Sequence, residues 1–267
     1  MRYKDLIYSI MQDGVNELNE RTRCYTKRLF AQTVSLRDVD NIFCPRKIYP
    51  HISAAEAVWM LGGSKSTAWL NKQTKIWEKF EDSPGIIETA YGHRWRVAFG
   101  RDQITQAIML LKKDPSSRQA LVMSWDPRTD GLMNQGKVKN VPCPFAFNLF
   151  ISEGEGRVVV YQRSCDVMAG LPYDLMTYFI LGQAIFNSVD KPFYGVDIMI
   201  GDAHVYEEHW GTAEKVLKTD NPDKGHCLNH YCDVQDLVSY GDKFVGFYKD
   251  IYADVNFKLA NKLEVAL

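Results

Sequence analysis

Two runs of alternating apolar residues in the middle of the chain constrain its fold more than any other feature. The runs span residues 145–151 and 158–162 and flank a glycine-rich turn. Alternation of this kind around such a turn predicts an antiparallel β-hairpin. Cys143 precedes the first strand, Arg163 follows the second, and Asp174 stands where the next helix is expected to start. A hairpin brings its two open ends together, so we expect these three side chains to converge on one pocket.

The rest of the chain alternates between helical and strand patterns. Apolar spacing and capping residues predict helices over 3–19, 53–61, 102–114, 173–187 and a segment through Trp210 and Val216. Short strands are predicted over 25–35, 120–125 and 195–200, loops over 36–52 and 89–96, and a mixed tail over 234–260. Because no repeat or linker interrupts these elements, they indicate one α+β domain over residues 1–267.

Composition limits the classes of function that fit this domain. The 267 residues are 46% hydrophobic, which is enough for a sizeable core. The net charge of −1 gives no general attraction to nucleic acid or to an anionic membrane, so an anionic substrate needs local arginines. No apolar run approaches the ~18 residues of a membrane span. The six cysteines are scattered and no secretory segment opens the chain, which favours reduced thiols in a cytoplasm.

A cluster of metal-binding residue types near the C-terminus suggests a second class of site. The cluster consists of His226, Cys227, His230 and Cys232. Its spacing fits no standard zinc finger, so we predict no metal and interpret the segment as a polar surface loop. A non-catalytic nucleotide- or RNA-binding protein is a further alternative. The chain keeps the cysteine and arginine of the hairpin, however, and its charge balance offers no broad basic face.

Several ordered motifs make the chain resemble thymidylate synthase and its pyrimidine-hydroxymethylase relatives. The most specific is QRSCDVMAGLP at 162–172, which GDAHVY follows at 201–206. Shorter matches are Glu20-Arg21-Thr22, Glu56 before Trp59, Ile76-Trp77, Tyr91-Gly92, Asp102-Gln103, Ser117-Arg118 and Pro142-Cys143. The resemblance implies a large mixed β-sheet flanked by helices and a homodimer formed through that sheet. It also implies transfer of a one-carbon unit from 5,10-methylenetetrahydrofolate to C5 of a pyrimidine nucleoside monophosphate.

The resemblance implies a catalytic role for Cys143, Glu56 and Tyr91, and also for Asp174, whose role concerns the base. Cys143 matches the family nucleophile, whose thiolate adds at C6 of the base and activates C5 for attack. A thiolate needs nearby positive charge, which Arg163 would supply. Glu56 matches the general acid/base that works through ordered water, and Tyr91 lines the reacting carbon. From the residues alone, Cys143 is equally a small buried hydrophobe, Tyr91 is core packing, and Glu56 forms a capping box with Ser53.

The resemblance implies that phosphate binding depends on the homodimer. Phosphate favours the forked donors of arginine, and Arg21, Arg163 and Ser164 match the family's phosphate ligands. Arg118 matches an arginine that the family donates across the dimer, which makes the homodimer part of the active site. The family pairs that arginine with a second one where this chain has Gln119, so one phosphate contact is in doubt. A single arginine is more often a solvated surface charge.

The remaining matches concern the sugar and the folate. His204 and Tyr206 match the pair that bonds the sugar 3′-hydroxyl, although a lone histidine is more often structural. Asp166 matches a residue at the nucleotide and the folate pterin, and its alternative is a turn aspartate. Trp77 matches a folate-lining residue, with core packing as its alternative. The folate contacts that the resemblance implies are Trp77, Asp166, Gly170 and Leu267.

Two departures from the family's sequence pattern indicate which pyrimidine base the site binds. Most of the family has Asn where this chain has Asp174. An amide suits the N3–H and O4 of uracil, whereas a carboxyl group suits the N4 amino group and N3 of cytosine. The alternative is that Asp174 caps the helix after Pro172. Pro144 stands where thymidylate synthases have a histidine of the water network around O4. Asn148, usually Gln in the family, is a further change without an assigned bond.

These departures favour a cytidylate as substrate, with dCMP ahead of CMP and the 2′-position left open. Hydride from the folate would leave a methyl group on C5, and water would leave a hydroxymethyl group. Relatives that act on cytidylates are mostly hydroxymethylases, often viral, which favours hydroxymethylation and a bacteriophage modified-base pathway. The alternatives are reductive methylation of dCMP and ordinary methylation of dUMP.

Overall fold

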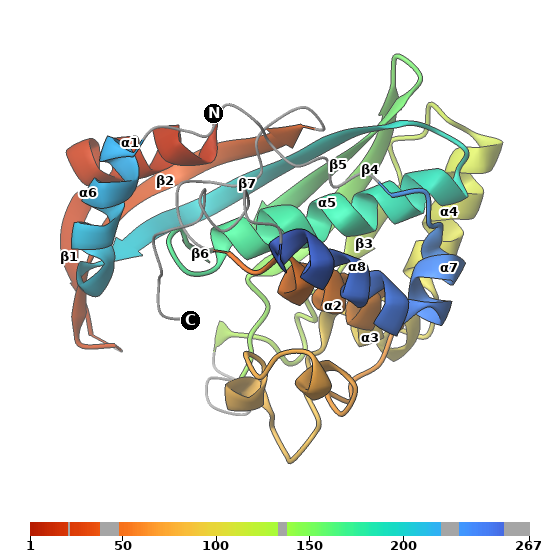
Figure 1. Cartoon of the computed structure of the whole chain (residues 1–267), viewed down its shortest axis with the longest axis horizontal. Helices are drawn as coiled ribbons and strands as arrows, with labels where there is room; N and C mark the ends of the chain where they lie inside the picture. Colours follow the sequence, from red (N-terminus) through yellow and green to blue (C-terminus); the bar gives the residue numbers. More distant parts are fainter. Residues whose placement is uncertain (21, 38–47, 133–137, 220–229, 254–267) are drawn as a thin grey trace.

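A mixed β-sheet forms the frame of the molecule. The computed structural model describes residues 1–20, 22–37, 48–132, 138–219 and 230–253. Within these ranges the sheet has seven strands in the order β1-β2-β7-β5-β4-β3, with β6 beside β7 (Figure 1). The strands are β1 (Val15–Asn19), β2 (Cys24–Arg37), β3 (Leu121–Met123), β4 (Pro144–Ser152), β5 (Glu155–Gln162), β6 (Cys165–Asp166) and β7 (Phe193–Tyr206).

The predicted hairpin is confirmed as β4 and β5. The two strands pair antiparallel from Ser152 opposite Glu155 to Pro144 opposite Gln162. The register shifts between Pro144 and Ala146, where proline has no N–H to donate to the ladder. β5 and β6 run parallel to β7, whereas the other pairs are antiparallel. This mixed sheet with flanking helices confirms the predicted fold class.

The helices form layers on one face of the sheet. They are α1 (Tyr3–Asp13), α2 (Pro50–Leu61), α3 (Tyr91–His93), α4 (Gln103–Lys113), α5 (Leu171–Ser188), α6 (Trp210–Lys218), α7 (Val234–Ser239) and α8 (Gly241–Ala253). α5 packs against β5 and β7, α2 lies on α5, and α8 lies on α2 (Figure 1). Because α5 is covered by the sheet below and by α2 above, its side chains are apolar almost all round, as predicted.

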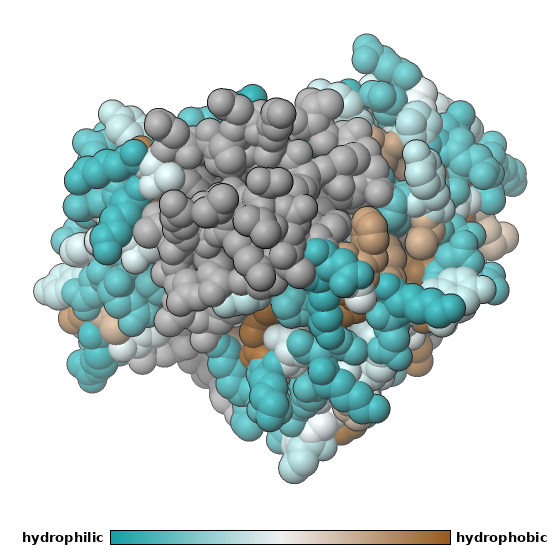
Figure 2. Space-filling model, in the orientation of Figure 1, coloured by the Kyte–Doolittle hydropathy of each residue, from teal (hydrophilic) through white to brown (hydrophobic). Residues whose placement is uncertain are grey.

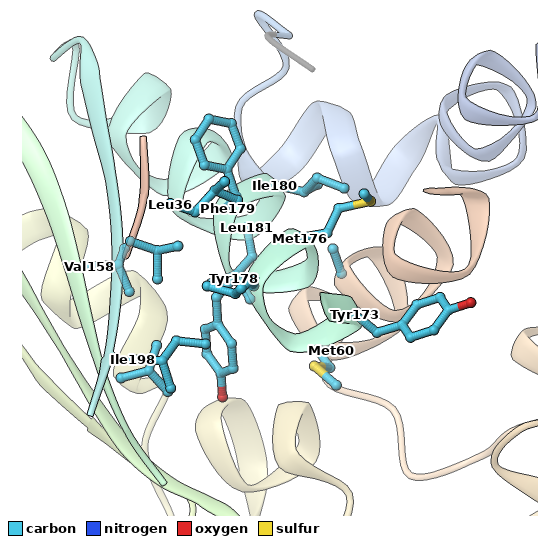
Figure 3. Packing of buried hydrophobic residues seen from close by; sticks show 14 of the residues in the cluster. Leu36, Met60, Val158, Tyr173, Met176, Tyr178, Phe179, Ile180, Leu181 and Ile198 are labelled. Carbon is cyan, nitrogen blue, oxygen red and sulfur yellow. The ribbon is translucent and has the colours of Figure 1, made fainter. Parts of the chain in front are cut away.

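The core lies between α5 and the sheet. Figure 3 shows Tyr178 and Leu181 of α5 beside Val158 and Ile198 of the sheet, all almost completely buried. Phe147 of β4 packs edge-on against Tyr178, with ring centroids 5.7 Å apart. Residues on this face of β4 and β5 therefore alternate with residues that point away from the helices. The candidate site lies at one end of this packed layer.

Three sequence predictions about the elements were wrong. The helix predicted over 3–19 ends at Asp13, and 15–19 is strand β1. A Cβ at Gly14 would lie 2.3 Å from the carbonyl oxygen of Ile10, so this glycine allows the sharp turn. The strand predicted over 195–200 continues to Tyr206, and α2 begins at Pro50 rather than at Ser53.

The loop predicted over 89–96 is also wrong, because it contains α3 and a π-helical turn (Arg94–Ala98). Its polar residues are buried with partners. Arg94 pairs with the buried Asp130, and the Trp95 indole donates to the hydroxyl of Ser124 over 2.8 Å. A Cβ at Gly92 would lie 1.9 Å from the carbonyl oxygen of Met60. α3 therefore packs directly on α2, which brings Tyr91 into the site.

The described surface is largely polar on the side covered by the helices. Figure 2 shows mostly hydrophilic residues there, with small hydrophobic areas between them. None of the helices in the described residues combines the length and apolar character that crossing a bilayer requires.

Candidate active site

Cys143 and Arg163 meet at the open end of the hairpin, as predicted. The Arg163 backbone N–H donates to the carbonyl oxygen of Cys143 over 3.0 Å. Its side chain donates from Nε to Pro142 O and from Nη2 to Val141 O, at 2.9 and 3.0 Å. Nη2 also lies 3.6 Å from the Sγ of Cys143. The guanidinium thus holds the segment before β4 in place and puts a positive charge beside the half-buried thiol, which favours its thiolate.

Tyr91 lies on the other side of this cysteine. Burial, with Cys143 and Asp174 as neighbours, raises the pKa of Tyr91 above its usual value, while hydrogen bonds from the Asn140 side chain and the Cys143 backbone oppose the rise. Asn140 is itself fixed, because its amide donates to the hydroxyl of Thr89 over 3.2 Å. Tyr91 is therefore a neutral phenol whose position is tied to the nucleophile.

Asp174 lies in the first turn of α5, and its carboxyl group faces the end of β5. Gln162 donates from Nε2 to its Oδ2 over 2.7 Å. Burial and the charges of Glu56 and Asp166 raise the pKa of Asp174 to about 7, against the lowering effect of the Gln162 hydrogen bond. The residue that caps α5 is Gly170, so Asp174 is not the cap, although it is the acidic residue of the first turn and so lies at the positive end of the helix, as the alternative also held. A carboxyl with this pKa exists in both protonation states near neutral pH.

Glu56 reaches the same region from α2. It is buried, and its oxygens accept hydrogen bonds from Trp77 Nε1 at 2.7 Å and from the hydroxyl of Thr177 at 3.0 Å. Ser53 donates instead to the carbonyl oxygen of Tyr173, so the capping-box interpretation of Ser53 and Glu56 is wrong. Burial raises the pKa of Glu56, and the two hydrogen bonds lower it. Burial is thus the larger of the two influences and favours the protonated form of this carboxyl group.

Trp77 connects this acid to a group of aromatic rings. Its ring centroid lies 5.3 Å from that of Trp59, 5.6 Å from Phe80 and 5.7 Å from Tyr91. The indole is buried, so the core-packing interpretation of Trp77 and Tyr91 accounts for part of their surroundings. Their polar atoms are nevertheless turned toward Glu56 and Cys143. The cluster therefore forms a wall that orients the two polar groups.

Asp166 and His204 are brought together by the pairing of β6 with β7. The Oδ1 of Asp166 accepts from the backbone N–H groups of Met168 and Ala169 at 2.9 and 3.0 Å, as in the turn interpretation. The His204 ring lies edge-on to that of Tyr206, with centroids 5.2 Å apart. Gly170, whose N–H donates to Asp166 O, carries the chain from this turn into α5.

The other predicted site residues are placed differently. Ser164 is half-buried between β5 and β6. Arg118 is exposed between α4 and β3 and makes no hydrogen bond or ion pair to the residues that the structure describes. Arg21 and Leu267 lie outside the described residues. The described part of a single chain therefore brings together Cys143, Arg163, Asp174, Glu56, Tyr91 and Trp77, and leaves Arg118 apart.

Sequence reasoning missed three polar residues that hold this site. Gln162 bonds Asp174, Thr177 bonds Glu56, and Asn140 bonds Tyr91. Two of them carried a signal. Thr177 stands three residues after Asp174, on the same face of a helix. Gln162 occupies a position in β5 whose side chain points toward the helices, where an apolar residue is expected.

Other residues with open roles are now located. Asn148 accepts from the hydroxyl of Tyr161 over 3.2 Å on the face of the sheet opposite α5, so it is not beside the Asp174 carboxyl group. Gln119 is exposed next to Arg118. His230 is buried, and its Nε2 lies 3.1 Å from the carbonyl oxygen of Ile180, so the surface-loop interpretation is wrong for this residue. His226 and Cys227 lie outside the described residues, which contain no group of three metal-ligand side chains.

Comparison with known proteins agrees with this geometry. The family model described as "Thymidylate synthase" matches residues 1–238. The chain is also similar to a thymidylate synthase of Corynebacterium aurimucosum, with 29% identity over 215 residues that cover 78% of each protein. The chain belongs to the thymidylate synthase family of folate-dependent enzymes, in which 5,10-methylenetetrahydrofolate donates a one-carbon unit to C5 of a pyrimidine nucleotide.

Proposed function

We propose that this chain modifies C5 of a cytidylate, with dCMP as the preferred nucleotide and 5-hydroxymethyl-dCMP as the product. The observation that carries the proposal is the Asp174 carboxyl group, which has a pKa of about 7 and lies among buried neighbours. When protonated, it donates to N3 of cytosine and accepts from the N4 amino group. When ionised, it pairs with a cytosine that is protonated at N3. Either way, one proton is shared between the acid and the base.

The nucleophile in this proposal is Cys143. Its thiolate adds to C6 of the pyrimidine, which places the electron pair on C5 for attack on the one-carbon unit. Arg163 stabilises the thiolate from 3.6 Å. Tyr91, fixed beside the cysteine, supplies a neutral hydroxyl at the face of the base where the proton on C5 must leave. When bound, the folate supplies the electrophilic carbon.

Glu56 handles protons at the 4-position in this proposal. Its raised pKa allows it to give and take a proton through water near N4 and C5. The bonds from Trp77 and Thr177 hold both of its oxygens in fixed positions. Pro144, next to the nucleophile, offers no side-chain bond to that water. The water at the 4-position is thus held differently from that in relatives with a histidine there.

The remaining ligand contacts are assigned to polar atoms that the hydrogen bonds within the protein do not use. The bonds of Arg163 to described residues use Nε and Nη2, which leaves Nη1 for a phosphate oxygen, together with Ser164 and Arg21. His204 and Tyr206 bind the sugar 3′-hydroxyl. Both backbone N–H groups at Asp166 go to Oδ1, which leaves Oδ2 to accept from the pterin of the folate. Trp77, Gly170 and Leu267 complete the folate site.

The proposal includes a homodimer formed through the sheet. The face opposite α5 carries exposed apolar side chains, among them Leu121 and Met199, and described residues leave it uncovered. Arg118 of the partner subunit would then complete the phosphate site. This arrangement gives the exposed Arg118 a ligand.

A second candidate, methylation of dUMP, is supported by the similarity to the thymidylate synthase of Corynebacterium aurimucosum. The test incubates the enzyme with 5,10-methylenetetrahydrofolate and dCMP, CMP or dUMP, and identifies the nucleotide product by mass. We expect dCMP to gain a hydroxymethyl group without stoichiometric dihydrofolate. Faster turnover of dUMP than of dCMP would overturn the cytidylate assignment, and dihydrofolate formed in step with product would overturn hydroxymethylation.

A further inference from the structure

Gln162 is held in an unusual way beside the base-reading carboxyl group. Its side chain is only 2% exposed, and Nε2 donates to Asp174 Oδ2 over 2.7 Å. Its other polar atom, Oε1, is buried and meets no hydrogen-bond partner among the described residues. An unpaired buried carbonyl is unfavourable, so its persistence calls for a compensating role.

An amide has two orientations toward a carboxyl oxygen, and they require different protonation states. With Nε2 toward Asp174, Gln162 donates to Oδ2, which must therefore be an acceptor. With the amide rotated by 180°, Oε1 would face Oδ2, and two acceptors repel unless that oxygen carries a proton. The orientation in the structure therefore makes Oδ2 the acceptor in this bond and favours Oδ1 as the position of the carboxyl proton.

The position of this proton matters because cytosine and uracil present opposite patterns of hydrogen-bond donors and acceptors. Cytosine offers an acceptor at N3 and a donor at N4, whereas uracil offers a donor at N3 and an acceptor at O4. A carboxylic acid has one donor and one acceptor oxygen, so moving its proton from one oxygen to the other converts a match for one base into a match for the other.

We propose that Gln162 is a positioning residue that determines base preference by donating to Oδ2 of Asp174 and so confining the carboxyl proton to Oδ1. The inference rests on the proposed role of Asp174 in reading the base. It assigns no bond between Gln162 and the nucleotide. It explains why a polar side chain with an unpaired carbonyl occupies a buried position at the end of β5.

The surroundings of Asp174 leave Gln162 in control of this proton. The titratable groups that interact with Asp174 come from α2, α3, β6 and α5: Glu56, Tyr91, Cys165, Asp166 and Tyr178. All of them are acids, so none donates a positive charge to fix one oxygen as the ionised one. Tyr178 is buried, and its hydroxyl also has no hydrogen-bond partner among the described residues. Gln162 supplies the hydrogen bond that opposes the rise in the pKa of Asp174.

Two nearly isosteric variants test the proposal. Gln162→Met removes the donor, and Gln162→Glu replaces it with a carboxyl group that favours a proton on Asp174 Oδ2. We expect the ratio of kcat/KM for dCMP to that for dUMP to change by about tenfold or more in both variants, and most in Gln162→Glu. The second readout is the titration of the Asp174 carboxyl carbon by ¹³C NMR. In Gln162→Met its pKa should rise from about 7 to about 8.

The control is Gln183→Met, which removes another buried glutamine of the core that bonds the His230 N–H. It should lower kcat/KM for both nucleotides by one common factor. The inference is overturned if the Gln162 variants also leave the ratio unchanged, or if the Asp174 titration does not move. Gln162→Glu keeps the test available if methionine disturbs β5. A wild-type preference for dUMP would overturn the cytidylate assignment alone, because the ratio would still move in the Gln162 variants.

Discussion

At the scale of single residues, the site depends on carboxyl groups that burial keeps from ionising freely. Burial raises the pKa of both Asp174 and Glu56, and the charge of Glu56 adds to the effect on Asp174. Each has a neutral or amide donor beside it, rather than an arginine that would hold it ionised. The guanidinium of Arg163 lies instead beside the thiol of Cys143. In the described residues a positive charge therefore lies beside the thiol, whereas the two carboxyl groups have uncharged hydrogen-bond donors.

Asp174→Asn tests the base-reading role directly. The amide donates to O4 and accepts from N3–H, so it matches uracil and leaves cytosine with unpaired buried groups. We expect the preference between dCMP and dUMP to move toward dUMP by about 100-fold or more, measured as a ratio of kcat/KM values. Asp190→Asn, at the far end of the same helix, is the control. Asp190 has φ +59°, a conformation that asparagine tolerates. An unchanged preference in Asp174→Asn would remove the residue from base recognition.

At the scale of elements, the sequence predicted what local pattern controls. The β4–β5 hairpin and the buried helix α5 were predicted because alternation and a continuous apolar run are visible in a short window. The helical turn around Arg94 was missed because its cause is an ion pair with the distant Asp130 carboxylate, whereas the break at Gly14 involves the carbonyl oxygen of Ile10, only four residues earlier. The proximity of Cys143 and Arg163 followed from the hairpin. Gln162 and Thr177 were missed because their partners lie on other elements.

The connection before α7 is fastened to α5 by a set of buried polar contacts. Asn187 donates to the carbonyl oxygens of His230 and Cys232, and Gln183 accepts from the His230 N–H at 3.0 Å. The His230 ring packs edge-on against Phe244, with centroids 5.0 Å apart. Burial lowers the pKa of His230 from 6.5 to about 4. The folded protein therefore holds this imidazole neutral.

The stability of the protein should consequently depend on His230 below neutral pH. The unfolded chain takes up a proton near pH 6.5 and the folded chain only near pH 4. Stability from this group is intact above pH 6.5 and is lost as the pH falls toward 4. Relative to His230→Gln, wild type should lose about 2 kcal/mol in its free energy of unfolding between pH 7.5 and 5. Urea unfolding of both proteins measures this, and a difference that stays constant with pH would contradict it.

At the scale of the whole molecule, the two arginines of the proposed phosphate site lie on different parts of one chain. Arg163 lies at the open end of the hairpin, whereas Arg118 is exposed beyond α4. The face of the sheet opposite α5 carries Asn148, Tyr161 and exposed apolar side chains. A dimer through this face would supply each site with Arg118 of the partner subunit and would remove those apolar groups from water.

Mixed dimers test this arrangement. Cys143→Ser and Arg118→Ala should each be almost inactive alone. Mixing equal amounts under conditions of subunit exchange should restore about a quarter of wild-type activity, because half of the dimers then contain one site with both residues. Arg101→Ala, which removes an exposed arginine of the turn before α4, is the control and should stay active on its own. Absence of recovery, with exchange shown by mass spectrometry of a tagged subunit, would contradict a shared site.

The long strand β7 has a consequence for how the protein is made. β2 pairs with β7 along most of its length, and Arg28 bonds Asp202 across a separation of 174 residues. Ribosomes add about 5 to 20 residues per second, so β2 waits about 10 to 30 s for its partner. During that time one edge of the emerging sheet is unpaired and open to other chains.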